Sequence, residues 1–111
     1  MFEQDLEIFY YAAANGRLPF REWFEDLRDY KTRVIIDARM TRLRTGNFGN
    51  CRSVGPNLIE LKIDYGPGYR IYFGRISCKV ILLLCGGDKS TQKKDILTAD
   101  QYWGHFKETH G

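Results

Sequence analysis

The sequence has no long hydrophobic run, and no apolar stretch among its 111 residues approaches the roughly 18–20 that a membrane-spanning helix needs. It also has no signal-peptide pattern, because residues 1–11, MFEQDLEIFYY, are acidic rather than basic. We therefore expect a cytoplasmic protein that does not bind a membrane.

Cysteine and histidine are scarce, with three and two residues respectively. Cys51, Cys78 and Cys85 form no C-x-x-C pair, so we expect free thiols, with Cys78 and Cys85 as small core residues. His105 and His110 are five residues apart, a spacing that does not align them on one face of a helix. Since no cysteine motif completes a site, we expect no bound metal and no other cofactor.

A strong net charge is also missing, since the chain carries only +3, but the charge is unevenly distributed. Residues 31–94 contain thirteen basic and four acidic side chains, whereas residues 1–30 and 95–111 are both net acidic. A basic middle suggests a polyanionic partner that approaches one surface. Part of this charge, such as that of Arg39 and Arg42, could instead solvate a helix.

The remaining composition is that of a globular protein, with 43% hydrophobic and 28% charged residues, and we expect a single domain over residues 1–111. Residues 4–11 alternate loosely, which is typical of a strand. From Pro19 to the Thr45-Gly46 stop, the helical spacing predicts two helices with a break at 27–31, or one bent helix. Residues 47–57, rich in glycine and asparagine, are typical of a loop.

Residues 78–85, CKVILLLC, are apolar on both faces and predict a central strand that is covered on both sides and ends at residues 86–88. The apolar residues that follow have helical spacing up to Phe106. The resulting order is β–α–α–β–β–β–α, which predicts an α+β fold with a small, mainly antiparallel sheet.

Residues 58–73, LIELKIDYGPGYRIYF, alternate apolar and polar side chains on both sides of a Gly-Pro-Gly turn. This period of two predicts a β-hairpin with one apolar face. A three-residue loop at 66–68 would place Asp64 opposite Arg70 as a cross-strand ion pair. The polar side chains would then share one surface, namely Glu60, Lys62, Asp64, Arg70 and Tyr72. The simplest interpretation of that surface is a solvated sheet face.

Residues 86–91, GGDKST, look like part of a phosphate-binding loop, but the first glycine of that motif is absent and Asp88 would repel a phosphate. The lysines nearby are a different signal. Lys89, Lys93 and Lys94 follow the predicted central strand, where side chains at a sheet edge can converge on a groove and contact phosphate. A solvated turn before a helix is the alternative interpretation.

The order of these elements and four short motifs together resemble the RelE/ParE superfamily of bacterial toxins from type II toxin–antitoxin modules. The likeness is greatest to the branch of phage-derived or addiction module killer proteins, related to HigB, and it covers essentially the whole chain. The motifs are LPFREWFEDL, R-x-x-x-L-R-T-G-N-F-G from Arg39 to Gly49, LKIDYGPGYRIYF, and LLLCGGDKSTQKKDI followed by Ala99.

The resemblance implies a compact toxin whose sheet is backed by two N-terminal helices. Many relatives cleave mRNA on the ribosome, whereas ParE-like relatives inhibit DNA gyrase and are not nucleases. A cognate antitoxin, expected to be a helix-turn-helix protein like HigA, keeps the toxin silent. In cleaving relatives, basic residues before the hairpin turn, after it and beyond the last strand surround the scissile phosphate, and the matching positions here are Lys62, Arg70 and Lys89.

RNA cleavage by the neighbouring 2′-OH needs a base, a cation at the phosphate and an acid for the leaving 5′-oxygen. Arg70 suits the phosphate, because its planar fork can bind two oxygens at once. Lys62 could position the phosphate, or act as the base if neighbouring positive charges make it lose its proton more readily. Glu60 is the alternative base, and Lys89 with its neighbours offers candidates for the acid. The residues expected to contact RNA beyond these are Arg52, Tyr72, Lys93 and Lys94.

Three functions remain open from the sequence: a ribosome-dependent mRNA endonuclease, an inhibitor of DNA gyrase that is not an enzyme, and a nucleic-acid-binding module without toxicity. The cluster of Lys62, Arg70 and Lys89 favours the endonuclease. Its partners would be mRNA, the ribosome and the antitoxin. This hypothesis requires the three cationic side chains to point into one hollow.

Overall fold

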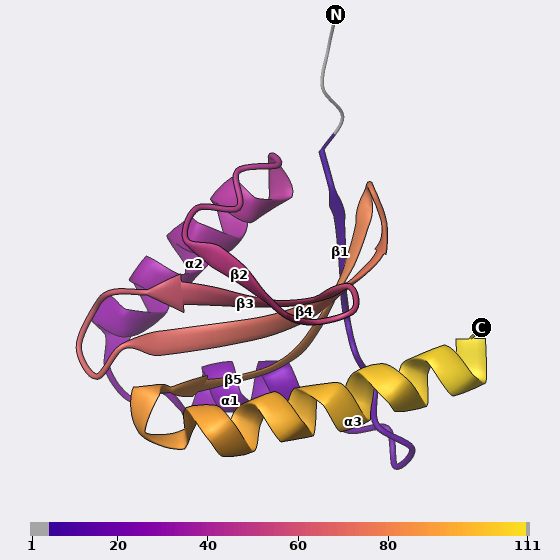
Figure 1. The fold of residues 1–111 in the computed structure, drawn as a ribbon. Coiled ribbons are helices and arrows are strands. Elements are labelled where there is room, and N and C mark those ends of the chain that lie inside the picture. Colours follow the sequence, from indigo (N-terminus) through magenta and orange to yellow (C-terminus); the bar gives the residue numbers. More distant parts are fainter. Residues whose placement is uncertain (1–4, 111) are drawn as a thin grey trace, which may run out of the picture.

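The computed structural model describes residues 5–110 and contains one five-stranded sheet with helices on both faces (Figure 1). In chain order the elements are β1 (Glu7–Tyr10), α1 (Pro19–Asp26), α2 (Tyr30–Arg44), β2 (Cys51–Gly55), β3 (Leu58–Ile63), β4 (Tyr69–Ser77), β5 (Val80–Asp88), a 3-10 turn (Lys89–Thr91) and α3 (Gln92–His110). The α+β class is confirmed, with one strand more than the sequence predicted.

The strands lie in the order β1-β5-β4-β3-β2, and all neighbours are antiparallel except the parallel pair of β1 and β5. On one face, α1 and α2 contribute Phe20, Ile36 and Leu43 to a hydrophobic core. On the other face, α3 contributes Ala99 and Trp103 to a second core (Figure 1). The sheet is therefore backed by the two N-terminal helices, as expected, and covered by α3 on its opposite side.

Of the two predicted alternatives, the structure contains two separate helices rather than one bent helix, with the break at residues 27–29. Pro19 begins α1, where its missing N–H costs no hydrogen bond. Asp29 caps α2 by accepting a hydrogen bond from a backbone N–H in the first turn. After α2 the chain passes through Thr45 to Gly46, whose φ of 90° ends the helix. Within residues 5–110, none of the helices is long and apolar enough to cross a membrane.

β5 is covered on both faces, as its apolar sequence predicts, although β4 is the middle strand of the sheet. Leu83 belongs to the core beneath α1 and α2, and Leu84 to the core beneath α3. Cys85 is buried in the second core, whereas Cys78 is exposed between β4 and β5. The prediction that both cysteines are core residues is therefore wrong for Cys78.

Three predicted boundaries differ from the structure. The strand predicted at 78–85 runs from Val80 to Asp88. The predicted loop at 47–57 contains β2, an edge strand that pairs only with β3. Its residues, CRSVG, include one glycine and no asparagine, and the asparagines that suggested a loop lie on either side of the strand. The first strand is shorter than the predicted 4–11, and residue 4 lies outside the described part of the chain.

The predicted hairpin is present, but its register differs by two residues. Ile63 pairs with Tyr69 and Lys62 with Arg70, so the loop spans residues 64–68 rather than 66–68. Shifting the register by two keeps every side chain on its predicted face, so only the loop geometry distinguishes the alternatives. Asp64 lies in this loop, and its predicted cross-strand pairing with Arg70 is wrong.

Candidate functional site

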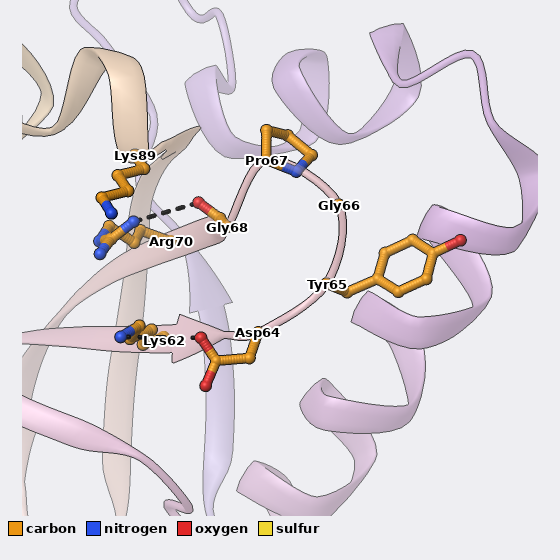
Figure 2. A pocket seen from close by; sticks show the side chains of 8 residues that line it. All are labelled: Lys62, Asp64, Tyr65, Gly66, Pro67, Gly68, Arg70 and Lys89. Atoms are coloured by element: carbon orange, nitrogen blue, oxygen red, sulfur yellow. Dashed lines mark hydrogen bonds and ion pairs between the residues drawn. The ribbon is translucent and has the colours of Figure 1, made fainter.

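A hollow with a volume of about 340 Å³ lies beside the β3–β4 turn, and we call it the turn hollow. Lys62 of β3, Arg70 of β4 and Lys89 of the 3-10 turn line it together with the loop residues 64–68 (Figure 2). The structure thus brings the three predicted cationic residues to one hollow.

Strand pairing explains this convergence. Lys62 is directly opposite Arg70, which is directly opposite Gly87 in β5. Lys89 follows Gly87 by two residues and therefore reaches the same end of the sheet. A side chain at Gly87 would collide with the carboxylate of Asp95, so this glycine allows α3 to begin directly over the site.

A second hollow, of about 420 Å³, adjoins the first, and we call it the β2 hollow. Lys62 and Arg70 line both hollows, so they form the wall between them. The other residues of the β2 hollow come from the start of β2, from β3 and from the first residue of α3; they are Asn50, Cys51, Arg52, Glu60 and Gln92.

Arg70 is buried to an unusual degree for a charged residue, with 6% of its surface exposed. Its Nη1 donates a hydrogen bond to the carbonyl oxygen of Gly68 at 3.1 Å. Its Nε lies 3.7 Å from Glu60 Oε2, too far for a hydrogen bond, and is the one buried side-chain N or O atom within residues 5–110 that lacks a hydrogen-bond partner. A buried guanidinium normally has its donors satisfied, and the nearest acceptor to this Nε is the Glu60 carboxylate. The side chain also lines the turn hollow and the β2 hollow, so its guanidinium is the buried cation nearest to a ligand there.

Glu60 is also buried, and its two oxygens receive three hydrogen bonds. Arg52 Nε donates to Oε1 at 2.7 Å, while Tyr72 OH and Gln92 Nε2 donate to Oε2 at 3.0 and 2.9 Å. Burial alone would raise the pKa of Glu60, but the hydrogen bonds from Arg52, Gln92 and Tyr72 outweigh it and hold that pKa below its ordinary value. An ionised carboxylate with both oxygens occupied is a poor proton acceptor, which argues against the predicted role of Glu60 as a base.

Tyr72 is fully buried beneath α3. Burial, together with the neighbouring Glu60 carboxylate, raises the pKa of its hydroxyl well above the ordinary value, so the hydroxyl remains a donor. The prediction that Tyr72 contacts RNA is therefore wrong, since no surface of its ring is available to a ligand. The polar face of the hairpin was expected to be solvated, but Glu60, Arg70 and Tyr72 on that face are all buried.

Lys93 and Lys94 line a separate hollow at the start of α3, of about 450 Å³. Lys89 belongs to both this hollow and the turn hollow, and Gln92 to both this hollow and the β2 hollow. The predicted RNA-contacting lysines thus lie beside the three cations but not among them. Asp95, close behind, accepts a hydrogen bond from the Thr91 hydroxyl.

The turn hollow and the β2 hollow are predominantly cationic. Four cations and two carboxylates line them, namely Lys62, Arg70, Lys89, Arg52, Glu60 and Asp64. Lys62 Nζ lies 3.6 Å from Asp64 Oδ1, an exposed ion pair of little strength. The excess of positive charge around a concave surface favours a phosphate-containing ligand.

Aromatic stacking is not provided at this site. Tyr65 lines the turn hollow, but its ring points toward α2 and away from the cations (Figure 2). Lys31 Nζ of α2 lies 5.9 Å from the centre of that ring. The described lining of the β2 hollow contains no aromatic residue. The arrangement can therefore hold the backbone of a nucleic acid more readily than it can stack a base.

Three site residues were not identified from the sequence in these positions: Asp64 in the turn, Asn50 before β2 and Gln92 at the start of α3. Had the sequence indicated a five-residue loop at 64–68, Asp64 would have been expected at the turn. Placing Asn50 and Gln92 at the site requires knowing that β2 exists and where α3 begins. Within residues 5–110, no three His, Cys, Asp or Glu side chains lie together as metal ligands would.

No protein-family model matches the chain. An uncharacterized protein of Haemophilus influenzae is 46% identical over 82 residues, which span 74% of this chain and 83% of that protein. At this identity and coverage, the chain belongs to the same protein family as the H. influenzae protein.

Proposed function

We propose that the protein is the toxin of a type II toxin–antitoxin module in the RelE/ParE superfamily and that it cleaves mRNA on the ribosome. Its target would place it in the cytoplasm. Its partners would be mRNA, the ribosome and an antitoxin of the helix-turn-helix, HigA-like type. An acidic antitoxin segment would complement the cationic hollows and block them.

The observation that carries this proposal is the state of Arg70. Its side chain is 6% exposed, and it lines both the turn hollow and the β2 hollow beside Lys62. A phosphodiester placed at the wall between the hollows would meet Arg70 and Lys62 together, with Lys89 on one side. Such a cationic wall stabilises the charge that accumulates on phosphorus oxygens during cleavage.

In the proposed reaction, the 2′-oxygen loses its proton and forms a bond to phosphorus while the bond from phosphorus to the 5′-oxygen breaks. The products are a 2′,3′-cyclic phosphate and a 5′-hydroxyl, which forms when the departing 5′-oxygen takes up a proton. Arg70 holds the phosphate, and Lys89 is positioned to give a proton to the 5′-oxygen. Asp64 and Lys62, which line the turn hollow, are the remaining groups that could accept the 2′ proton.

The test is cleavage of a defined message in a bacterial translation extract, mapped by primer extension. Wild-type protein should yield discrete 5′ ends, and Arg70→Ala should lower the cleavage rate by about 10²–10³-fold. Arg70→Lys should recover only part of the rate, because a lysine keeps the charge but loses the planar fork.

Arg42→Ala is the matched control, since Arg42 is an exposed arginine on α2, across the sheet from the hollows. It should cleave at the wild-type rate. Circular dichroism and urea unfolding of each variant separate loss of activity from loss of fold. Intact message in the presence of folded wild-type protein would refute the nuclease proposal.

A second candidate is the ParE-like inhibition of DNA gyrase without cleavage of RNA. The observation that favours it is that Glu60 and Tyr72 are both occupied in a buried network, which leaves few groups for proton transfer at the hollows. It predicts gyrase-dependent DNA breaks and an intact message in the same assays.

A further inference from the structure

We infer that Glu60 is a positioning residue, which holds Arg70 in the wall between the two hollows and Arg52 at the rim of the β2 hollow. The inference rests on the proposed function in one respect, namely that Arg70 binds the phosphate of RNA. It assigns Glu60 a role that differs from proton transfer and that no comparison with known proteins supplies.

The first argument is the placement of the carboxylate between two arginines. Arg52 Nε donates to Glu60 Oε1 at 2.7 Å, and Arg70 Nε lies 3.7 Å from Glu60 Oε2. Arg52 is exposed and Arg70 is buried, so one carboxylate links a cation at the rim of the β2 hollow to a cation in its wall.

The second argument is that the carboxylate itself is held from two further elements. Tyr72 of β4 and Gln92 of α3 both donate to Oε2. Tyr72 has no exposed surface, so its hydroxyl cannot turn toward solvent. Glu60 is thereby held by β2, β4 and α3 at once, and a group so constrained transmits its position to whatever it contacts.

The third argument concerns the charge of Arg70. Its guanidinium is buried, and Glu60 is the one carboxylate with an ion pair to it among the described residues. A buried cation whose partner is removed becomes strongly unfavourable and tends to move toward water. The low pKa of Glu60 keeps its charge in place at neutral pH. Without that charge, Arg70 would leave the wall between the hollows.

The competing roles make different predictions for Glu60→Gln, which keeps the shape of the side chain and removes the charge. A base would lose about 10²–10⁴-fold in rate and the acidic limb of the pH–rate profile. A positioning residue would lose about tenfold in rate with the same profile. A residue that only supports the fold would lower stability without any effect on Arg70.

The first experiment needs no RNA. In ¹⁵N-labelled protein, the Nε–H resonance of Arg70, identified by its loss in Arg70→Lys, should exchange slowly with water because the group is buried. Glu60→Gln should speed this exchange at least about tenfold, whereas Glu108→Gln, an exposed glutamate on α3, should not change it. An unchanged Arg70 resonance in folded Glu60→Gln would overturn the inference, whatever the protein does to RNA.

The second experiment is a double-mutant cycle on the cleavage rate, with wild type, Glu60→Gln, Arg70→Ala and the double variant. If Glu60 acts through Arg70, adding Glu60→Gln to Arg70→Ala should lower the rate by less than about twofold. An equal further loss in both backgrounds would show that Glu60 acts independently and would overturn the inference. If wild type does not cut RNA, the proposed nuclease fails by itself, and the same cycle is measured on affinity for a 2′-O-methyl oligonucleotide.

Discussion

Lys62 and Arg70 are directly opposite each other in the β3–β4 ladder, and both line the two cationic hollows. Like charges directly opposite in a sheet are destabilising. The hairpin therefore maintains an arrangement that costs stability at the position where it would meet a phosphate, which is typical of residues that serve binding rather than folding.

Removing one of these charges should stabilise the protein and weaken binding. We expect Lys62→Gln to raise the free energy of unfolding by about 0.2–1 kcal/mol, toward the lower end because the lysine is half-exposed and screened by water. Its affinity for single-stranded RNA should fall. Urea unfolding and fluorescence anisotropy measure the two effects, with Arg42→Gln, at an exposed arginine on α2, as the control. A loss of stability in Lys62→Gln would contradict the prediction.

The stability of the protein should depend on pH through Glu60. Since the folded-state pKa of Glu60 lies below its ordinary value of 4.5, the carboxylate contributes stability at neutral pH that is lost as the pH falls through the folded value. Wild type should therefore exceed Glu60→Gln in free energy of unfolding at about pH 7, and this difference should shrink toward about pH 3. Urea unfolding across that range measures it; a constant difference would be the contrary result.

Two glycines near Trp103 should respond to alanine in opposite directions. A Cβ at Gly74 of β4 would collide with the Trp103 ring, whereas a Cβ at Gly104 of α3 would meet nothing within 4 Å. Gly74→Ala should lower the free energy of unfolding by about 1–3 kcal/mol through overpacking. Gly104→Ala should raise it by about 0.5–1 kcal/mol through helix propensity. Urea unfolding of both variants tests the packing of α3 on the sheet, and effects of the same sign would speak against it.

The salt dependence of RNA affinity should show how many phosphates the turn hollow contacts. If Lys89 contacts one phosphate, Lys89→Ala should reduce the slope of log affinity against log salt by about 0.7 for a single strand. Lys107→Ala, near the other end of α3, should leave the slope unchanged. Anisotropy titrations with an uncleavable RNA at several salt concentrations provide both slopes. Equal slopes for all three proteins would remove Lys89 from the interface.

Alternation and helical spacing predict the hairpin, the face shared by Lys62 and Arg70, and a helical segment after Pro19 that could be two helices or one bent helix. The structure contains two. The grouping of Lys62 and Arg70 with Lys89 was implied by the resemblance to the toxin superfamily, and the structure places all three around the turn hollow. Strand β2 could not be predicted, since an edge strand with one partner and exposed side chains needs little β propensity.

The buried positions and hydrogen bonds of Glu60 and Tyr72 could not be predicted from the sequence for a different reason. A period of two places both on one face of the hairpin but does not say what covers that face. The covering element, α3, contributes Gln92 and buries Tyr72 through tertiary contacts that involve distant parts of the chain. The hairpin register could not be predicted either. A loop of three residues and a loop of five residues both leave the apolar side chains of the two strands on one face and the polar side chains on the other.

The two hollows are lined by different segments of the chain and share one pair of residues. The hairpin loop shapes one compartment, the segment before β2 shapes the other, and the Lys62–Arg70 pair is common to both. Insertions or substitutions in either segment can remodel one compartment while the shared anchor stays in its ladder position. A change in the hairpin loop therefore alters the turn hollow and a change before β2 alters the β2 hollow, while the pairing of Lys62 with Arg70 between them is kept.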